Sequence, residues 1–249
     1  MNQVQRIGLA LDSLAWCDEI VVVDSGSTDG TIELCRAHPS GKVRVIAHPW
    51  LGFNGQREYA AAQCRNDWVL MLDADEECSP ALRAEIEKLP PERFQDTAIF
   101  AIPRQNYLAK RHVRCWGPDY QTRLIHKGRV VWDKAPIPEH RAPQPGFKLR
   151  HLKSPLFHNR LTPYSAIDFA DGRRIQDYGL SLGETLHTRG RRGSYPDMLL
   201  RPAFTFLKYY VFKGGFLDGR FGLAIAYKTT MMVMAIYSVL YGKELENQK

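Results

Sequence analysis

The first 80 residues alternate between short, continuously apolar runs and segments with helical spacing, and this alternation restricts the fold more than any other feature. Strands are predicted over residues 19–23, 43–48 and 68–72, of which the first is short and apolar on both faces, as a buried parallel strand is, and the third is a continuous apolar run. Helices are predicted over residues 31–37 and 56–64, and another where Val4, Ile7, Leu11 and Leu14 recur at helical spacing. A further helix is predicted from Ser79-Pro80, because serine is a favourable N-cap and proline a favourable first helical residue. Strands separated by helices predict an α/β fold with a parallel sheet.

The residue pattern of the chain changes after residue 103. Residues 104–160 contain scattered aromatics and two strand-like pieces, 121–126 and 129–133, which we interpret as a mixed edge of the same sheet. From Tyr164 onward the pattern is helical again. We therefore predict a core domain over residues 1–160 and a helical tail over residues 161–249.

Charge is unevenly distributed along the chain, whose formal net charge is +7. Residues 1–103 carry nine Lys/Arg against 16 Asp/Glu, residues 104–160 carry 13 against three, and residues 161–249 carry 12 against eight. This pattern indicates a site that handles a cation and an anion together, although solvated surface charge would give the same distribution. The five cysteines form no C-x-x-C pair, which argues against a zinc knuckle or a disulfide framework and favours a reducing, cytoplasmic compartment.

Two carboxylates, Asp73 and Asp75, follow the third apolar run directly. In open α/β sheets ligands bind beyond the carboxyl ends of strands, and the i, i+2 spacing points both carboxylates the same way. Two hard oxygen ligands suit Mg²⁺ or Mn²⁺, which commonly bridge protein carboxylates and substrate phosphates. The alternative is that both aspartates only end the strand and cap the helix after Ser79.

A second polar cluster, residues 24–30, follows the first apolar run. Asp24 is able to accept hydrogen bonds from a base or ribose, while Gly26 and Ser27 line a polar turn before a predicted helix N-terminus. The alternative is an ordinary strand–turn–helix connection capped by Ser27 or Thr28. The two clusters together are more specific than either alone.

Three segments jointly carry a resemblance to a known family: IVVVDSGSTDGT at 20–31, WLGFNGQR at 50–57 and WVLMLDADEE at 68–77. WGPDYQTRL at 116–124, PEH at 138–140 and GFLDG at 215–219 extend it. The chain resembles family 2 glycosyltransferases, and among them bacterial lipopolysaccharide or lipooligosaccharide core β-1,4-glucosyltransferases. The resemblance implies a Rossmann-like A-type glycosyltransferase fold, a nucleotide-sugar donor such as a UDP-sugar, and a divalent metal.

The resemblance also implies roles for individual residues. The domain over residues 1–160 would bind the donor and catalyse transfer of a hexose such as glucose, with inversion, to a lipopolysaccharide-core or related anionic glycolipid. Asp73 and Asp75 would hold the Mg²⁺ or Mn²⁺ ion. The residues that would contact the donor are Asp24, Ser27, Asp29, Gln56 and Asp73. Sugar transfer to a polyprenyl phosphate or a protein is one alternative, and a non-catalytic basic protein that binds membrane or RNA is another.

The N-terminus departs from the family pattern. Members usually begin with an apolar strand followed by Asn-Glu, whereas this chain has Asn2-Gln3 at the corresponding place. Either the start codon lies further upstream, which we favour, or the sheet lacks its first strand and leaves a neighbouring strand exposed.

The catalytic base has two candidates. Asp119, in Gly-Pro-Asp-Tyr-Gln, resembles the place where the family often carries its acidic base. Glu139, in Pro-Glu-His, has a neighbouring imidazole that is able to orient it. Each also has a structural interpretation, because Asp119 is able to pair with Arg123 and Glu139 to cap a turn.

The remaining polar and apolar features point to partners. The basic excess over residues 104–160 fits an anionic glycolipid acceptor, and we expect no nucleic acid because no recognised nucleic-acid module accompanies it. The histidines at 126, 140, 151 and 158 lack i, i+4 spacing, so structural or phosphate-contacting roles are favoured over a metal site.

The tail interleaves aromatic and basic residues, which predicts a helix on the inner face of the cytoplasmic membrane, with plain packing on the core as the alternative. The aromatic and apolar members are Phe204, Phe206, Leu207, Tyr210, Val211, Phe212, Phe216 and Phe221, and the basic members are Lys208, Lys213 and Arg220. The run from Thr229 to Gly242 is judged too short to span a bilayer.

Overall fold

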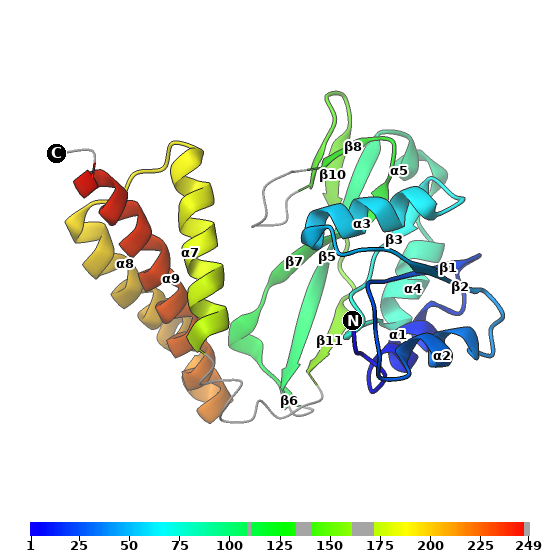
Figure 1. Cartoon of the computed structure of the whole chain (residues 1–249), viewed down its shortest axis with the longest axis horizontal. Helices are drawn as coiled ribbons and strands as arrows, with labels where there is room; N and C mark the ends of the chain where they lie inside the picture. Colours follow the sequence, from blue (N-terminus) through cyan, green and yellow to red (C-terminus); the bar gives the residue numbers. More distant parts are fainter. Residues whose placement is uncertain (109–110, 133–140, 161–171, 247–249) are drawn as a thin grey trace. The chain divides into compact units, whose positions relative to one another are not determined.

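The computed structural model describes residues 1–108, 111–132, 141–160 and 172–246. These residues divide into a sheet unit, comprising residues 1–105, 118–132 and 141–160, and a helical unit, comprising residues 106–108, 111–117 and 172–246 (Figure 1). Each unit has its own buried core. The segment 106–117 contributes its described residues to the helical unit, whereas we placed it in the predicted core domain.

The predicted alternation of helices and strands is confirmed over the first 87 residues. In chain order the elements are α1 (Ile7–Leu14), β1 (Ile20–Asp24), α2 (Thr31–Arg36), β2 (Val43–Ala47), α3 (Gly52–Gln63), β3 (Trp68–Leu70), β4 (Glu76–Cys78) and α4 (Pro80–Glu87). The Ser79 hydroxyl accepts a 3.0 Å hydrogen bond from the Leu82 amide, so Ser79 is the N-cap that the sequence predicts. The α/β class is therefore confirmed.

The sheet is mixed rather than mostly parallel. Its later elements are α5 (Pro91–Gln95), β5 (Thr97–Leu108), β7 (Asp119–His126), β8 (Val130–Trp132), β9 (Arg141–Pro143), β10 (Lys148–His151) and β11 (Leu156–Arg160). β1 pairs with β2 and β10 with β5 in parallel, whereas β7 runs antiparallel to both β3 and β5. A parallel pair requires a crossover of a dozen or more residues, usually a helix, and only a short excursion joins β5 to β7.

The strands of the sheet unit form separate ladders among the described residues. β1 and β2 make one, β8 and β9 another, and the largest follows the order β3-β7-β5-β11-β4. Within this part of the chain, β1 pairs only with β2 and β3 only with β7. One edge of β1 and one edge of β3 are thus without a partner among the described residues.

Apolar side chains from several elements close the core of the sheet unit. Phe100 and Ile102 of β5 pack with Leu124 of β7 and with Leu82 of α4, all of them buried. A second cluster joins α1 to β1 and α2 through Leu11, Ile20 and Cys35, and Ala74 packs against it. Ala74 lies between Asp73 and Asp75, so this contact anchors the turn that carries both carboxylates.

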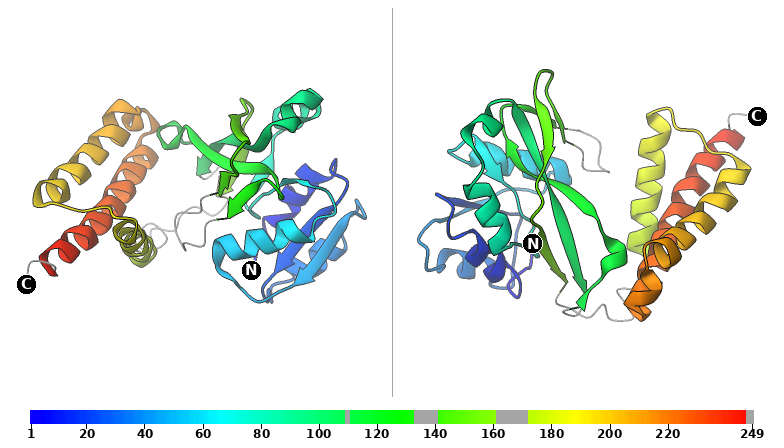
Figure 2. Two further views of the ribbon diagram at one scale, coloured as in Figure 1. Left: turned by 90° about the horizontal axis from the view of Figure 1, so that it is seen from above. Right: turned by 180° about the vertical axis from the view of Figure 1, so that it is seen from behind.

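The helical unit is built around one long helix, α9 (Arg220–Glu246), which packs on α7 (Gly172–Thr188) and α8 (Tyr195–Leu207) (Figure 2). A β-carbon added at Gly179 of α7 would lie 2.6 Å from the β-carbon of Ala235, and one added at Gly183 would lie 2.8 Å from the β-carbon of Val239. Only glycine permits this close approach of two helices. The other elements of the unit are β6 (Arg111–His112), η1 (Arg114–Trp116), the π-helix η2 (Lys208–Phe212) and the 3-10 helix η3 (Gly215–Asp218).

Helix α9 corrects the expectation about spanning length. The run from Thr229 to Gly242 belongs to a helix of 27 residues, which by length and composition is able to cross a membrane. Among the described residues it is the one helix that meets this criterion, and only 22% of its most apolar window is buried. Length and composition alone do not distinguish a spanning helix from a helix of a soluble bundle.

Candidate active site

The loop after β1 is organised by Asp24, which is 5% exposed. One carboxylate oxygen accepts hydrogen bonds from the backbone amides of Gly26 and Ser27, at 2.8 and 2.7 Å, and the other accepts one from the Ser27 hydroxyl. Burial acts to raise the pKa of Asp24, but these hydrogen bonds outweigh it and lower the pKa. Asp24 is therefore an ionised carboxylate that fixes the shape of the loop.

Asp29, at the far end of the same loop, contacts the N-terminal segment and the start of α2. Its carboxylate accepts hydrogen bonds from the amides of Val4 and Thr31, each at 3.1 Å. The hydroxyl of Thr31 lowers the pKa of Asp29. Asp29 thus links its own loop to the N-terminal segment and to the start of α2.

Two consecutive residues of α3 connect the loop to the third strand. The side-chain amide of Gln56 donates a 3.0 Å hydrogen bond to the Ser25 hydroxyl, beside Asp24. The guanidinium of Arg57 lies 2.6 Å from one oxygen of Asp73. The two polar clusters that the sequence places after separate strands are thus linked by one turn of helix.

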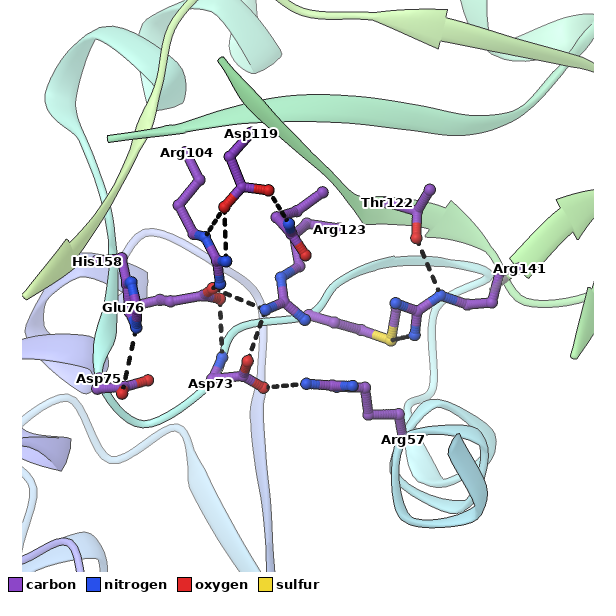
Figure 3. Close-up of polar contacts among 12 residues, drawn as sticks. Arg57, Asp73, Asp75, Glu76, Arg104, Asp119, Thr122, Arg123, Arg141 and His158 are labelled. Atoms are coloured by element: carbon purple, nitrogen blue, oxygen red, sulfur yellow. Dashed lines mark hydrogen bonds and ion pairs between the residues drawn. The ribbon is translucent and has the colours of Figure 1, made fainter. Parts of the chain in front are cut away.

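Both oxygens of Asp73 are engaged by arginines (Figure 3). The second oxygen lies 2.6 Å from Arg123, which is 2% exposed. Burial alone would raise the pKa of Asp73, but Arg123 and Arg57 hold it well below its usual range. Asp73 is therefore ionised, and its negative charge is balanced by the protein itself.

Asp75 has a different environment from Asp73. Its carboxylate lies 3.4 Å from Nε2 of His158 and 3.9 Å from the guanidinium of Arg6. The antiparallel pairing of β11 with β4 places His158 opposite Glu76 and hence beside Asp75. The described residues contain no cluster of three or more His, Cys, Asp or Glu suited to a metal ion, and Asp75 and His158 form a pair.

Glu76, which is fully buried, is the centre of an ion network behind these aspartates (Figure 3). Its carboxylate lies 2.7 Å from Arg123 and 3.0 Å from Arg104. Burial tends to lower the pKa of both arginines, but their carboxylate partners raise it. Glu76 therefore couples the strand that carries Arg104 to the turn that carries Asp73.

Asp119, one predicted base, begins β7 and is part of the same network. One of its oxygens accepts hydrogen bonds from Arg104 at 2.9 and 2.6 Å, and the other accepts one from Gln121 at 2.6 Å. Arg104, not the expected Arg123, is thus its ion-pair partner. Glu139, the other predicted base, lies outside the described residues.

Several residues of the site were not predicted from the sequence as donor-binding, metal-binding or catalytic residues. They are Arg57, Glu76, Arg104, Arg123, Arg141 and His158, and four of these six are arginines. The basic excess of residues 104–160 was a signal for Arg104, Arg123 and Arg141, but composition does not specify which arginines are buried. The sequence analysis considered His158 only as a structural or phosphate-contacting histidine, because its proximity to Asp75 depends on strand register.

Comparison with known proteins places this geometry in a family. Residues 2–153 match glycosyl transferase family 2. The chain belongs to that family. The match covers the sheet unit almost completely and includes Asp24, Asp73, Asp75 and Asp119.

Curated relatives of the family 2 chain align over part of their length. An uncharacterized glycosyltransferase of Rickettsia typhi is 43% identical over 96 residues, which is 38% of this chain and 32% of that protein. The lipopolysaccharide core biosynthesis glycosyltransferase LpsC of Rhizobium meliloti is 40% identical over 91 residues, 36% of this chain and 34% of LpsC. The chain thus aligns with about a third of the length of these relatives.

Among solved structures, TarS residues 1–349 of S. aureus are similar to this chain with a TM-score of 0.47 and 14% sequence identity. The alignment covers 92% of this chain and 87% of that one.

Proposed function

We propose that this chain transfers a hexose from a nucleotide-diphosphate donor to a hydroxyl group of an anionic glycolipid. The observation that carries the proposal is the set of carboxylates at the strand ends: Asp73 and Asp119 share one ion network with Glu76, Arg104 and the buried Arg123, and Asp75 lies beside His158. Membership of family 2 supports a glycosyl transfer, and the lipopolysaccharide-core relative supports a glycolipid acceptor. We propose UDP-glucose as the first donor to test.

The chemistry of Asp75 fits a divalent cation better than that of Asp73. Both oxygens of Asp73 already face guanidinium groups, whose positive charge opposes a nearby metal ion. Asp75 has Nε2 of His158 at 3.4 Å and a guanidinium, that of Arg6, only at 3.9 Å, and Mg²⁺ or Mn²⁺ is commonly held by one or two carboxylates together with substrate phosphates. We propose Asp75, with His158, as the residues that would hold the ion, and keep Asp73 as a donor-binding residue. When bound, the ion would neutralise charge on the departing diphosphate.

The chain's own residues supply the remaining steps. Asp24, Ser27 and Gln56 shape the loop that would receive the nucleoside, while Asp29 secures that loop to the N-terminal segment. A carboxylate, Asp119 or Glu139, would accept the proton of the acceptor hydroxyl as the sugar is transferred with inversion. Arg104 orients Asp119 through a two-point contact.

Membrane association is proposed for the helical unit. Leu217 and Phe212 are 74% and 72% exposed, and basic residues Lys208 and Arg220 are exposed close to them in the chain. Exposed apolar side chains beside positive charge suit the surface of an anionic membrane, and a glycolipid acceptor would be found there. We propose the inner face of the cytoplasmic membrane, consistent with five unpaired cysteines.

The test is metal-dependent donor binding and turnover with the full chain. UDP binding is measured by calorimetry with Mg²⁺, with Mn²⁺ and with a chelator, and UDP release from UDP-glucose is measured with a lipopolysaccharide-core acceptor. Asp75→Asn should lose the metal-dependent part of the binding. Asp12→Asn, on an exposed aspartate whose side-chain partner among the described residues is His38, should behave like the wild type. A UDP affinity that is the same with and without the chelator contradicts the metal assignment. Binding without turnover of any nucleotide sugar supports a non-catalytic protein.

A further inference from the structure

Arg141 is a buried cation without a carboxylate partner. It lies on β9 and is 6% exposed, and no Asp or Glu of the described residues lies within ion-pair distance of it. Its Nε donates a 3.3 Å hydrogen bond to the hydroxyl of Thr122, and Nη1 lies 3.7 Å from the sulfur of Met71. The guanidinium also lies 5.2 Å from the centre of the Trp132 ring. None of these neutral groups balances the charge.

The nearest charged side chains increase this imbalance. Burial is the main cause that lowers the pKa of Arg141, to about 9, and the positive charges of Arg57 and Arg123 lower it further. Asp73 and Glu76 act in the opposite direction, but they are already paired with Arg57, Arg123 and Arg104. In the described network four guanidiniums therefore face three carboxylates, the third being Asp119.

Other arginines of the sheet unit show how a structural arginine is satisfied here. Arg150 lies 2.9 Å from the carboxylate of Asp96, and Nη1 of Arg129 donates to the backbone oxygens of Phe94 and Thr97. Arg141 has no such contact, and in addition Nε of Arg123 is buried without a hydrogen-bond acceptor in the described part of the chain. A buried charge without a counter-charge is costly, so it is retained where something else supplies the opposite charge.

We propose that Arg141 is the principal residue of an oxyanion-binding subsite beside Asp73, which takes a phosphate or carboxylate group of a substrate. The planar guanidinium presents paired donors that match such groups. Arg57 and Arg123 add positive charge on the side of Asp73, whose side chain is 36% exposed and gives the subsite contact with solvent. Figure 3 shows Arg141, Arg57 and Arg123 converging from three different elements on this region.

Two substrate groups share this chemistry. The diphosphate of the donor would approach from the side of Asp73, to which Arg57 and Arg123 are bound. An anionic group of the acceptor would approach from the side of β7, because Arg141 bonds Thr122, three residues after the candidate base Asp119. Assigning the anion to a substrate rests on the proposed function, whereas the existence of the subsite does not.

The experiment measures binding of inorganic phosphate to the full chain by calorimetry, without divalent metal, together with thermal unfolding. The wild type should bind phosphate, and Arg141→Met should weaken this binding at least about tenfold, because it removes the charge and keeps much of the side-chain volume. Removing an uncompensated buried charge should also leave the melting temperature of the free protein unchanged or raise it. Arg150→Met is the matched control, which should lower the melting temperature and keep phosphate affinity.

Competition with UDP then identifies the source of the anion. Phosphate displaced by UDP in the wild type indicates the donor diphosphate, and phosphate that binds together with UDP indicates the acceptor. If Arg141→Met does not fold, Arg141→Lys replaces it, with weaker binding expected because the two-point contact is lost. Unchanged phosphate affinity in the variant, or no binding by the wild type, overturns the subsite. A wild type that binds phosphate through Arg141 but transfers no sugar refutes the proposed function alone.

Discussion

The sheet unit and the helical unit depart from the usual distribution of residues in opposite ways. The sheet unit buries charge, with Glu76 at 0%, Arg123 at 2% and Arg141 at 6% exposure. The helical unit exposes large apolar side chains, with Leu217 at 74% and Phe212 at 72%. Soluble proteins rarely bury Arg or Glu fully unless they are paired, and contiguous exposed apolar patches mark interaction sites.

This difference separates two kinds of functional surface. Buried charges hold one another at fixed positions, which suits recognition of a charged donor and the placement of a catalytic carboxylate. Exposed apolar residues are adapted to a non-aqueous partner, which for the helical unit we propose to be a membrane. Variants in each unit should therefore alter different properties of the same chain.

The largest effect on stability is expected from Glu76→Gln. The substitution leaves Arg123 and Arg104 with one carboxylate fewer in a buried network, and breaking a buried ion pair typically costs about 3–5 kcal/mol. The measurement is the free energy of unfolding in urea. Glu87→Gln, in an exposed pair with Arg83, should cost only about 0.3–0.5 kcal/mol. Equal losses for the two variants would show that the network does not stabilise the sheet unit.

The next largest effect concerns the catalytic base. Asp119→Asn and Glu139→Gln keep the shape of the side chain, so the true base should show near-normal donor affinity while turnover falls at least about a hundredfold. Donor binding and turnover are measured separately. Asp96→Asn, which removes an ion-pair partner of Lys148 and Arg150, should affect stability and not turnover. Normal turnover in both base variants excludes both candidates.

The sequence was sufficient to predict the parts of the site that are local in the chain. Asp24, Asp73 and Asp75 follow apolar runs directly, and the strands and helices around them form where the pattern predicts. The α/β class and the Ser79 cap followed from the same local rules. The position of a residue that directly follows a strand can be predicted without knowing how the strands pair.

The remainder depends on contacts between distant segments. The sequence analysis could pair Asp119 only with nearby Arg123, whereas the partner is Arg104 on the neighbouring strand β5. His158 faces Asp75 because β11 pairs with β4 in one particular register. The mixed sheet has the same origin, since antiparallel pairing of β7 with β3 joins segments more than 50 residues apart. Periodicity within one segment contains no information about these pairings.

A smaller effect is expected for membrane partition of the helical unit. Replacing exposed Phe212 and Leu217 by serine should reduce binding to anionic liposomes about tenfold, which is about 1.4 kcal/mol, because at a membrane surface the two side chains gain only part of the about 1.5–3 kcal/mol that each would contribute on full burial. Binding by the wild type should weaken as salt rises. Co-sedimentation measures both, and Trp50→Ser, at an exposed site of the sheet unit, should have no effect. Equal binding to neutral and anionic liposomes at every salt concentration would favour plain packing of the helices.

The smallest effect is a pH dependence that belongs to the sheet unit. The folded-state pKa of Asp24 is lowered, since hydrogen bonds from Ser27 and Gly26 outweigh the effect of burial. Asp24 therefore contributes stability that is fully present above its unfolded-state pKa of about 3.9 and is lost as pH falls through the lower folded-state value. Ser27→Ala removes one donor to this carboxylate, which should cost about 0.5–1.5 kcal/mol at pH 7.

The pH dependence distinguishes this mechanism from a general loss of packing. The stability difference between wild type and Ser27→Ala should shrink as pH falls below about 4 and through the lower folded-state pKa, where Asp24 becomes protonated and the hydroxyl no longer faces an ionised group. Ser13→Ala is the control, since the partners of the Ser13 hydroxyl in the described part of the chain are two backbone groups, of Ala10 and Cys78. Its cost should be the same at pH 7 and pH 3. If the stability lost in Ser27→Ala is equally independent of pH, the hydroxyl acts through its hydrogen bond with the Asn2 amide. The carboxylate of Asp24 is then held by the backbone amides of Gly26 and Ser27 alone.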